Sequence, residues 1–156
     1  DYYERAIACV RAAGMAASST AIVLPIYTQW RIHEFSQCWQ QRGNVGKYDN
    51  IAFDLHWYHD FHSAWSLLSH AQHCQVVGES ARVMCLLEGA VVGEWSLARP
   101  STHTEEQVKD FATSQVRAYN HASHGWFFWN WHDHDCYDKW DMQRGVFARI
   151  RLPMPL

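Results

Sequence analysis

A glutamate, a histidine and a tyrosine stand where short apolar runs of the sequence end. Glu94 lies at the end of residues 89–95, and His56 and Tyr58 lie at the end of residues 51–58. A carboxylate can attack an anomeric carbon while a neighbouring phenol hydroxyl holds it in place. We therefore take Glu94, Tyr58 and His56 as candidate catalytic residues for the hydrolysis of a glycosidic bond.

Aromatic side chains gather near the same polar groups. The sequence has nine Trp, seven Tyr and seven Phe among 156 residues, and such rings suit stacking on sugar faces. The candidate substrate-binding residues are Tyr27, Gln29, Trp95, Trp129 and Trp131. An aromatic core is an equal explanation of the composition, and loop packing is an equal explanation for Tyr27 and Gln29.

Apolar runs alternate with amphipathic patterns along the chain. The runs that predict buried strands are residues 21–26, 51–58, 89–95 and 126–131. The patterns that predict helices are residues 2–13, 31–41, 63–74, 104–121 and, weakly, 137–147. Strands that alternate with helices form parallel sheets, so we predict one α/β domain. The pattern fits a doubly wound open sheet and half of an eight-stranded barrel equally well, and ligand sites in such folds lie at the strand ends.

Composition and charge exclude several classes of partner. Hydrophobic residues make up 48% of the chain and charged residues 19%, which indicates a globular protein. The formal net charge is −3 and the basic residues are scattered, so we expect no nucleic-acid partner. No apolar run approaches the roughly 20 residues of a membrane span.

The five cysteines are widely spaced, which fits neither a dense disulfide scaffold nor a Cys-x-x-Cys metal site.

Four stretches resemble glycoside hydrolase family five, in particular the fungal-type exo-β-1,3-glucanases. Val-Val-Gly-Glu-Trp-Ser (residues 91–96) resembles the nucleophile strand of that family. Asp-Leu-His-Trp-Tyr (54–58) resembles its Asp-x-His-x-Tyr strand, and Gly-Trp-Phe-Phe-Trp-Asn-Trp (125–131) resembles its last barrel strand. Lys-Trp-Asp-Met (139–142) resembles the Glu-Trp segment that follows. The four matches occur in the order that the family has.

The resemblance implies a (β/α)8 TIM barrel. Residues 1–156 would be the C-terminal half of this single domain, with strands five to eight and their helices. Glu94 would be the nucleophile, Tyr58 its hydrogen-bond partner and His56 part of the polar network around it. Trp131 would be the floor of the sugar subsite, with Trp129 as the alternative.

The same resemblance implies an activity. The protein would be a retaining β-glucan hydrolase of the glucan 1,3-β-glucosidase type, acting on a β-glucan or a related β-linked glucoside. Its location would be extracellular or in the cell wall. We expect no cofactor, because carboxylates and water carry out both steps of the retaining reaction.

The sequence departs from the family pattern at the second carboxyl group. A retaining hydrolase needs two carboxyl groups about 5–5.5 Å apart, and these 156 residues lack the Asn-Glu-Pro motif that holds the acid/base glutamate of the family. We expect that glutamate outside this chain, on a missing N-terminal half or on a partner chain that also covers the open barrel edges. In addition, His-Asp-His-Asp (132–135) stands where relatives carry Lys-Thr-Glu-Asn.

Two other classes of function stay open. One is a non-catalytic glycan-binding or structural subunit that kept the aromatic rim of a glycosidase barrel. The other is a metal site, because His56, His59 and His62 recur within seven residues and residues 132–135 add further ligand types. We expect no metal at these positions, since His59 and His62 fall beyond the predicted strand.

Overall fold

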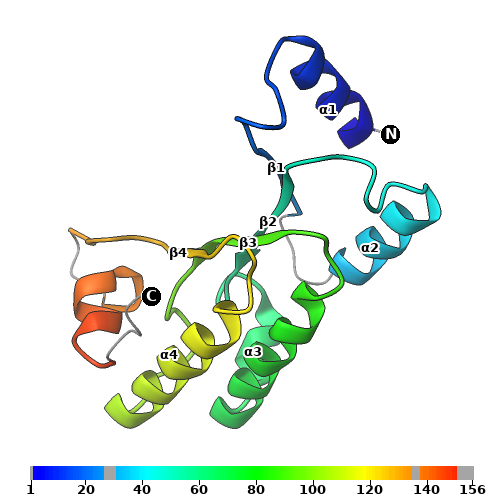
Figure 1. The fold of residues 1–156 in the computed structure, drawn as a ribbon. Coiled ribbons are helices and arrows are strands. Elements are labelled where there is room, and N and C mark those ends of the chain that lie inside the picture. The colour runs from blue at the N-terminus through cyan, green and yellow to red at the C-terminus, as the bar shows by residue number, and fades with distance from the viewer. Residues whose placement is uncertain (1, 27–30, 135–137, 151–156) are drawn as a thin grey trace.

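A parallel sheet of four strands forms the centre of the protein. The computed structural model describes residues 2–26, 31–134 and 138–150. The strands are β1 (Ile22–Pro25), β2 (Ile51–Trp57), β3 (Ala90–Trp95) and β4 (Trp126–Phe128). They lie side by side in chain order, and every neighbouring pair is parallel (Figure 1). The expectation of a parallel α/β fold is confirmed, and the unbroken order is the order that consecutive barrel strands have.

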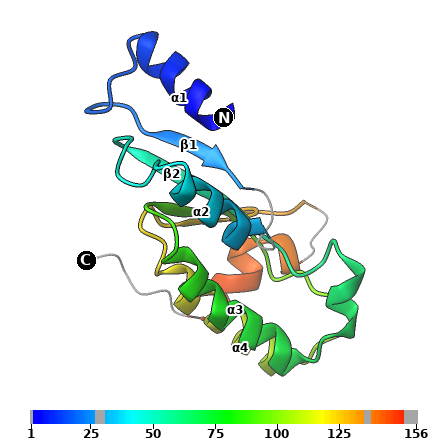
Figure 2. The same cartoon turned by 90° about the vertical axis from the view of Figure 1, so that its right-hand side faces the viewer.

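Helices precede and connect the strands. The α-helices are α1 (Tyr2–Ala12), α2 (Ile32–Gln41), α3 (His70–Met84) and α4 (Glu105–Tyr119). Helices α3 and α4 pack side by side on one side of the sheet, as both views show (Figures 1 and 2). Within the described residues no helix has the length and apolar character that crossing a membrane requires.

Three predicted elements differ from those in the structure. The expected helix at 63–74 is a 3-10 turn, η2 (Ser63–Leu67), followed by α3, because Ser69 and Gln72 form a capping box that starts the helix there. The expected strand at 126–131 stops at Phe128. The expected last helix consists of a 3-10 turn, η3 (Asp138–Trp140), and a π-helix, η4 (Met142–Phe147).

The two faces of the sheet have different environments. Side chains that point to the helices are buried in one hydrophobic core, and they include Phe53, Leu55, Trp57, Val92 and Trp95. Alternate residues of β2 point to the other face, where Asp54 and His56 are partly exposed. The helix layer therefore fixes the strands, and the opposite face is left to carry polar groups.

Candidate active site

Glu94 lies next to His56 because β3 carries an extra residue. Val92 pairs with Leu55 of β2, but the next pair is Glu94 with His56. Gly93 therefore has no partner in β2 and forms a β-bulge. A bulge changes the direction of the side chains that follow it. The bulge brings Glu94 and His56 together at the carboxyl end of the sheet.

Tyr58 follows β2 directly and contacts the same carboxylate. Its hydroxyl donates to Glu94 Oε2 at 2.7 Å. Burial and this hydrogen bond raise the pKa of the Tyr58 phenol well above its usual value, so the phenol remains a donor at neutral pH. The expected hydrogen bond between Tyr58 and Glu94 is present, and the catalytic roles of the two residues stay predictions.

His56 lies between two carboxylates. Its Nε2 is 3.0 Å from Asp54 Oδ2, and its Nδ1 is 3.3 Å from Glu94 Oε2. A neutral imidazole has one N–H and donates to one carboxylate, whereas an imidazolium donates to both. The three side chains are partly exposed, so a ligand at this end of the sheet can reach the group.

Asp54 does not fit the role of the second carboxyl group. Its Oδ2 is bonded to His56, and its Oδ1 is buried with no hydrogen-bond partner among the described residues. The backbone at Gly93 covers Oδ1 so closely that a Cβ there would overlap it. An acid that protonates a leaving group must come within hydrogen-bond distance of it. Asp54 is therefore better placed to orient His56.

The expectation that Trp95 contacts substrate is wrong. Its side chain is 0% exposed and packs in the helix-facing core. The ring centroids of Tyr119, Trp126 and Phe128 lie 5.3, 5.2 and 4.8 Å from it. Successive residues of a strand point to opposite faces, so Trp95 turns away from the face that Glu94 occupies.

The other two tryptophan candidates lie just beyond β4. Trp129 N donates to Trp95 O at 2.8 Å, and the peptide between Trp129 and Asn130 is cis. The side chains of Trp129 and Trp131 are 51% and 59% exposed, and the Trp131 ring meets Phe147 edge-on at 5.8 Å. Both rings have open surface for stacking, while sugar binding itself stays a prediction.

Trp140 supports the site, although it was not among the candidate substrate-binding residues. Its ring packs against Tyr58 and Phe61, with centroids 5.5 and 5.8 Å away. The only signal was its place in the stretch at 139–142 that resembles the family. Tyr27 and Gln29, in contrast, lie outside the described residues, so their expected contacts with substrate stay predictions.

The three histidines that suggested a metal site have separate surroundings. His56 belongs to the polar group described above. His59 is buried in the helix layer, with Nδ1 2.9 Å from Nδ1 of His73. His62 is exposed and accepts a backbone N–H at the start of η2. Within the described part of the chain, no possible metal cluster joins them.

The histidine and aspartate that follow Trp131 anchor a loop. His132 Nδ1 is 2.8 Å from Asp141 Oδ2, and Asp133 N donates to the same oxygen at 3.1 Å. Backbone N–H groups of Arg144 and Asp133 hold the pKa of the buried Asp141 carboxyl below its usual value. Asp141 is thus an acceptor that fixes the segment after β4 to η4, and Asp135 lies outside the described residues.

Comparisons with known proteins bear on the fold. The sequence matches no protein-family model and no curated protein. Among solved structures, the fold is similar to the crystal structure of rutinosidase from Aspergillus niger, with a TM-score of 0.51 and 16% sequence identity. The match covers 83% of this chain and 33% of that chain, so this chain spans about a third of the length of the rutinosidase. The chain therefore has an α/β fold similar to part of a glycosidase.

Proposed function

We propose that this chain supplies the nucleophile-bearing half of a retaining β-glucan hydrolase of the glucan 1,3-β-glucosidase type. The observation that carries the proposal is the contact of Tyr58 and His56 with Glu94, at the carboxyl ends of two adjacent parallel strands. The sequence resemblance to glycoside hydrolase family five and the fold similarity to a rutinosidase support it. Residues 1–156 would be the C-terminal half of one (β/α)8 domain.

The geometry suggests how Glu94 would react. Tyr58 and His56 both approach Oε2 of the carboxylate, and no hydrogen bond or ion pair of the described residues involves Oε1. Oε1 would attack the anomeric carbon as the bond to the leaving oxygen breaks, and the acid/base would protonate that oxygen. Water would then release the sugar from the ester, returning the carboxylate. Tyr58, bonded to Oε2, would hold the Glu94 carboxylate in place for the attack.

Parts of the proposal lie outside the described residues. The acid/base glutamate would come from an N-terminal half or a partner chain, because Asp54 is covered by the bulge at Gly93. The same partner would pair with the sheet edges at β1 and β4. A β-glucan substrate and an extracellular or cell-wall location rest on the family resemblance.

The nucleophile can be tested without the acid/base. A 2-deoxy-2-fluoro-β-glucoside with a dinitrophenolate leaving group needs no general acid for the first step, and the fluorine slows hydrolysis of the ester. We expect the intact mass of the chain to rise by one fluoroglucosyl group, and peptide mapping to place that group on Glu94. Glu94→Gln should abolish the labelling, and Glu34→Gln on the exposed surface of α2 should leave it unchanged.

The outcome separates two functions. Labelling at Glu94 supports a glycosidase, and labelling at another carboxylate would contradict the assignment of the nucleophile. A non-catalytic glycan-binding subunit is the second candidate, and the exposed rings of Trp129 and Trp131 favour it. It predicts saturable binding of a β-1,3-glucan oligosaccharide with no labelling, and loss of that binding in Trp129→Ala or Trp131→Ala.

A further inference from the structure

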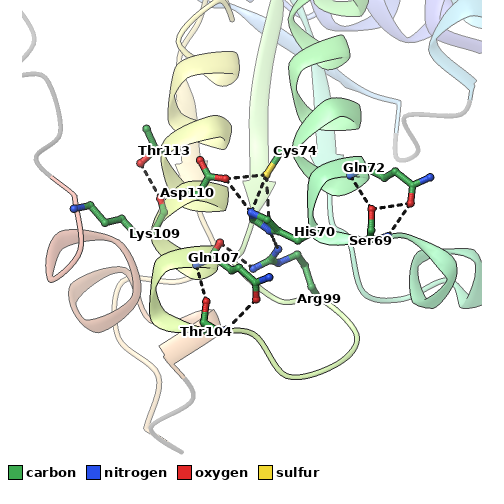
Figure 3. A network of polar contacts seen from close by, with 10 residues as sticks. All are labelled: Ser69, His70, Gln72, Cys74, Arg99, Thr104, Gln107, Lys109, Asp110 and Thr113. Atoms are coloured by element: carbon green, nitrogen blue, oxygen red, sulfur yellow. Dashed lines mark hydrogen bonds and ion pairs between the residues drawn. The ribbon is translucent and has the colours of Figure 1, made fainter.

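A second cluster of reactive side chains lies in the helix layer, where the proposed glycosidase uses no residue. His70 and Cys74 are four residues apart on α3, so they share one face of that helix. Asp110 of α4 points at them across the contact between the two helices (Figure 3). Imidazole, thiolate and carboxylate are all ligands of zinc-class divalent cations.

The spacing of the three donor atoms suits a tetrahedral ion. His70 Nε2 lies 2.9 Å from Asp110 Oδ2, and Cys74 Sγ lies 3.8 Å from each of them. Zinc bonds of about 2.0–2.3 Å at tetrahedral angles place such atoms roughly 3.3–3.6 Å apart. The side chains would need to shift by only a few tenths of an ångström to enclose an ion.

The cluster is also accessible. Asp110 and Thr113 line two neighbouring depressions. The first, of about 580 Å³, is also lined by His70, and the second, of about 340 Å³, is also lined by Cys74. An ion can enter from either side, and a fourth ligand from solvent can complete its coordination. One thiolate and one carboxylate would balance the two positive charges of the ion.

Arg99 opposes such an ion. Its Nη1 lies 2.9 Å from His70 Nδ1, and a guanidinium can only donate. His70 Nδ1 must therefore accept, which leaves the imidazole hydrogen on Nε2, directed at Asp110. An ion needs the lone pair of Nε2, so the hydrogen must move to Nδ1, where Arg99 has no acceptor for it.

We propose that His70, Cys74 and Asp110 bind a zinc-class divalent cation, and that Arg99 weakens the binding by holding His70 in the competing tautomer. On binding, the Cys74 thiol loses its proton to solvent and the imidazole proton moves from Nε2 to Nδ1. The site is independent of Glu94 and of the proposed hydrolysis. It predicts measurable affinity in the native chain and higher affinity once the guanidinium is removed.

Zinc titration of the metal-free chain by calorimetry tests the site, and cobalt absorption tests its ligands. We expect one ion per chain, with the thiolate-to-cobalt band and the visible bands of tetrahedral cobalt. Cys74→Ala and Asp110→Asn should each weaken zinc binding at least tenfold. Cys85→Ala is the matched control, because Cys85 is an exposed cysteine at the other end of α3. Absence of saturable binding, or unchanged binding in Cys74→Ala, would overturn the site.

Arg99→Met tests the role of the guanidinium. Arg99 is buried, its Nε has no hydrogen-bond partner among the described residues, and it packs over the Phe111 ring, so the apolar methionine suits the same space. We expect about tenfold tighter zinc binding, since one hydrogen bond to a charged group no longer competes. Arg99→Gln, whose amide oxygen can accept from Nδ1–H, should act in the same direction. Unchanged or weaker binding in both variants would refute the role of Arg99.

Discussion

The position of Glu94 depends on a residue that has no side chain. Gly93 is the extra residue of β3, and its backbone lies against the carboxylate of Asp54. Asp54 in turn contacts His56, which contacts Glu94. A change at Gly93 should therefore pass through Asp54 and His56 to the candidate nucleophile.

Gly93→Ala should destabilise the protein and disturb the site. The new methyl group overlaps Asp54 Oδ1, so the carboxylate must move and its bond to His56 must weaken. We expect a loss of about 1–3 kcal/mol in the free energy of unfolding, the usual result of overpacking, as measured by urea denaturation. In an Asp54→Ala background the same substitution should cost much less.

Gly78→Ala is the control for the glycine substitution. Gly78 lies inside α3 with open space around its Cα, so alanine should stabilise the helix by about 0.5–1 kcal/mol. Equal losses for Gly93→Ala with and without Asp54 would show that the overlap is not the cause.

Tyr58→Phe should slow the reaction less than Glu94→Gln does. It removes one hydrogen bond to the carboxylate and keeps the ring contacts with Trp140 and Phe61. We expect the rate of labelling by the activated fluoroglucoside to fall about tenfold to a hundredfold, the value of one hydrogen bond to a charged group. A loss as complete as that of Glu94→Gln would mean that Tyr58 does more than hold the nucleophile.

The residues of the site were predictable where they lie at the carboxyl ends of parallel strands, the usual place of ligand sites in such folds. Glu94, His56 and Tyr58 meet because carboxyl ends of parallel strands share one edge. Trp95 was wrongly selected because it follows Glu94 directly, and two successive strand residues face opposite ways. The spacing of His70 and Cys74 was visible in the sequence, but Asp110 joins them only through the packing of α3 on α4.

At the scale of elements, η2 is attached to the helix layer by a pair of buried histidines. His59 stacks on Trp65 at 4.2 Å, and its Nδ1 lies 2.9 Å from Nδ1 of His73 on α3. One of the two Nδ1 atoms carries the hydrogen and donates it, and the other accepts. If both Nδ1 atoms carried a hydrogen, the hydrogen bond would be lost and the two N–H groups would repel each other. Burial, with the nearby charges of His73 and Arg99, lowers the pKa of His59 to about 3.

Acid should therefore loosen this contact. His59 takes up a proton near pH 6.5 in the unfolded chain but only near pH 3 in the folded chain. Its contribution to stability is complete above about pH 6.5 and is lost as the pH falls toward 3. We expect a smaller fall in unfolding free energy between pH 7 and pH 4 for His59→Phe than for the unchanged protein. His33→Asn, exposed on α2, should keep the original slope; an equal slope in His59→Phe would contradict the assignment.

The elements themselves were mostly predictable, and their ends were not. Buried apolar runs located all four strands. The helix expected at 63–74 was wrong because Leu67 and Leu68 continue the apolar pattern, while the capping box of Ser69 and Gln72 sets the true start of α3. The short length of β4 depends on its contacts with β3 and the segment after it, which no local pattern contains.

At the scale of the whole molecule, the sheet has two outer strands. β1 pairs only with β2, and β4 pairs only with β3, among the strands that the structure describes. Each of these outer strands therefore has one unpaired edge. Unpaired strand edges attract further strands. The strand order resembles part of a barrel, and a whole barrel removes both edges by closing on itself. We therefore expect this chain alone to associate through its edges.

Val23→Lys tests this association at the edge of β1. Val23 is 52% exposed, and a lysine on an outer strand opposes pairing with another strand. We expect sedimentation velocity to show oligomers of the unchanged chain and a shift toward monomer in Val23→Lys. Val45→Lys, at a loop position that is 56% exposed, adds the same charge away from the sheet and should keep the oligomers. If both lysines act equally, repulsion by net charge explains the effect, and the edge of β1 is not the contact.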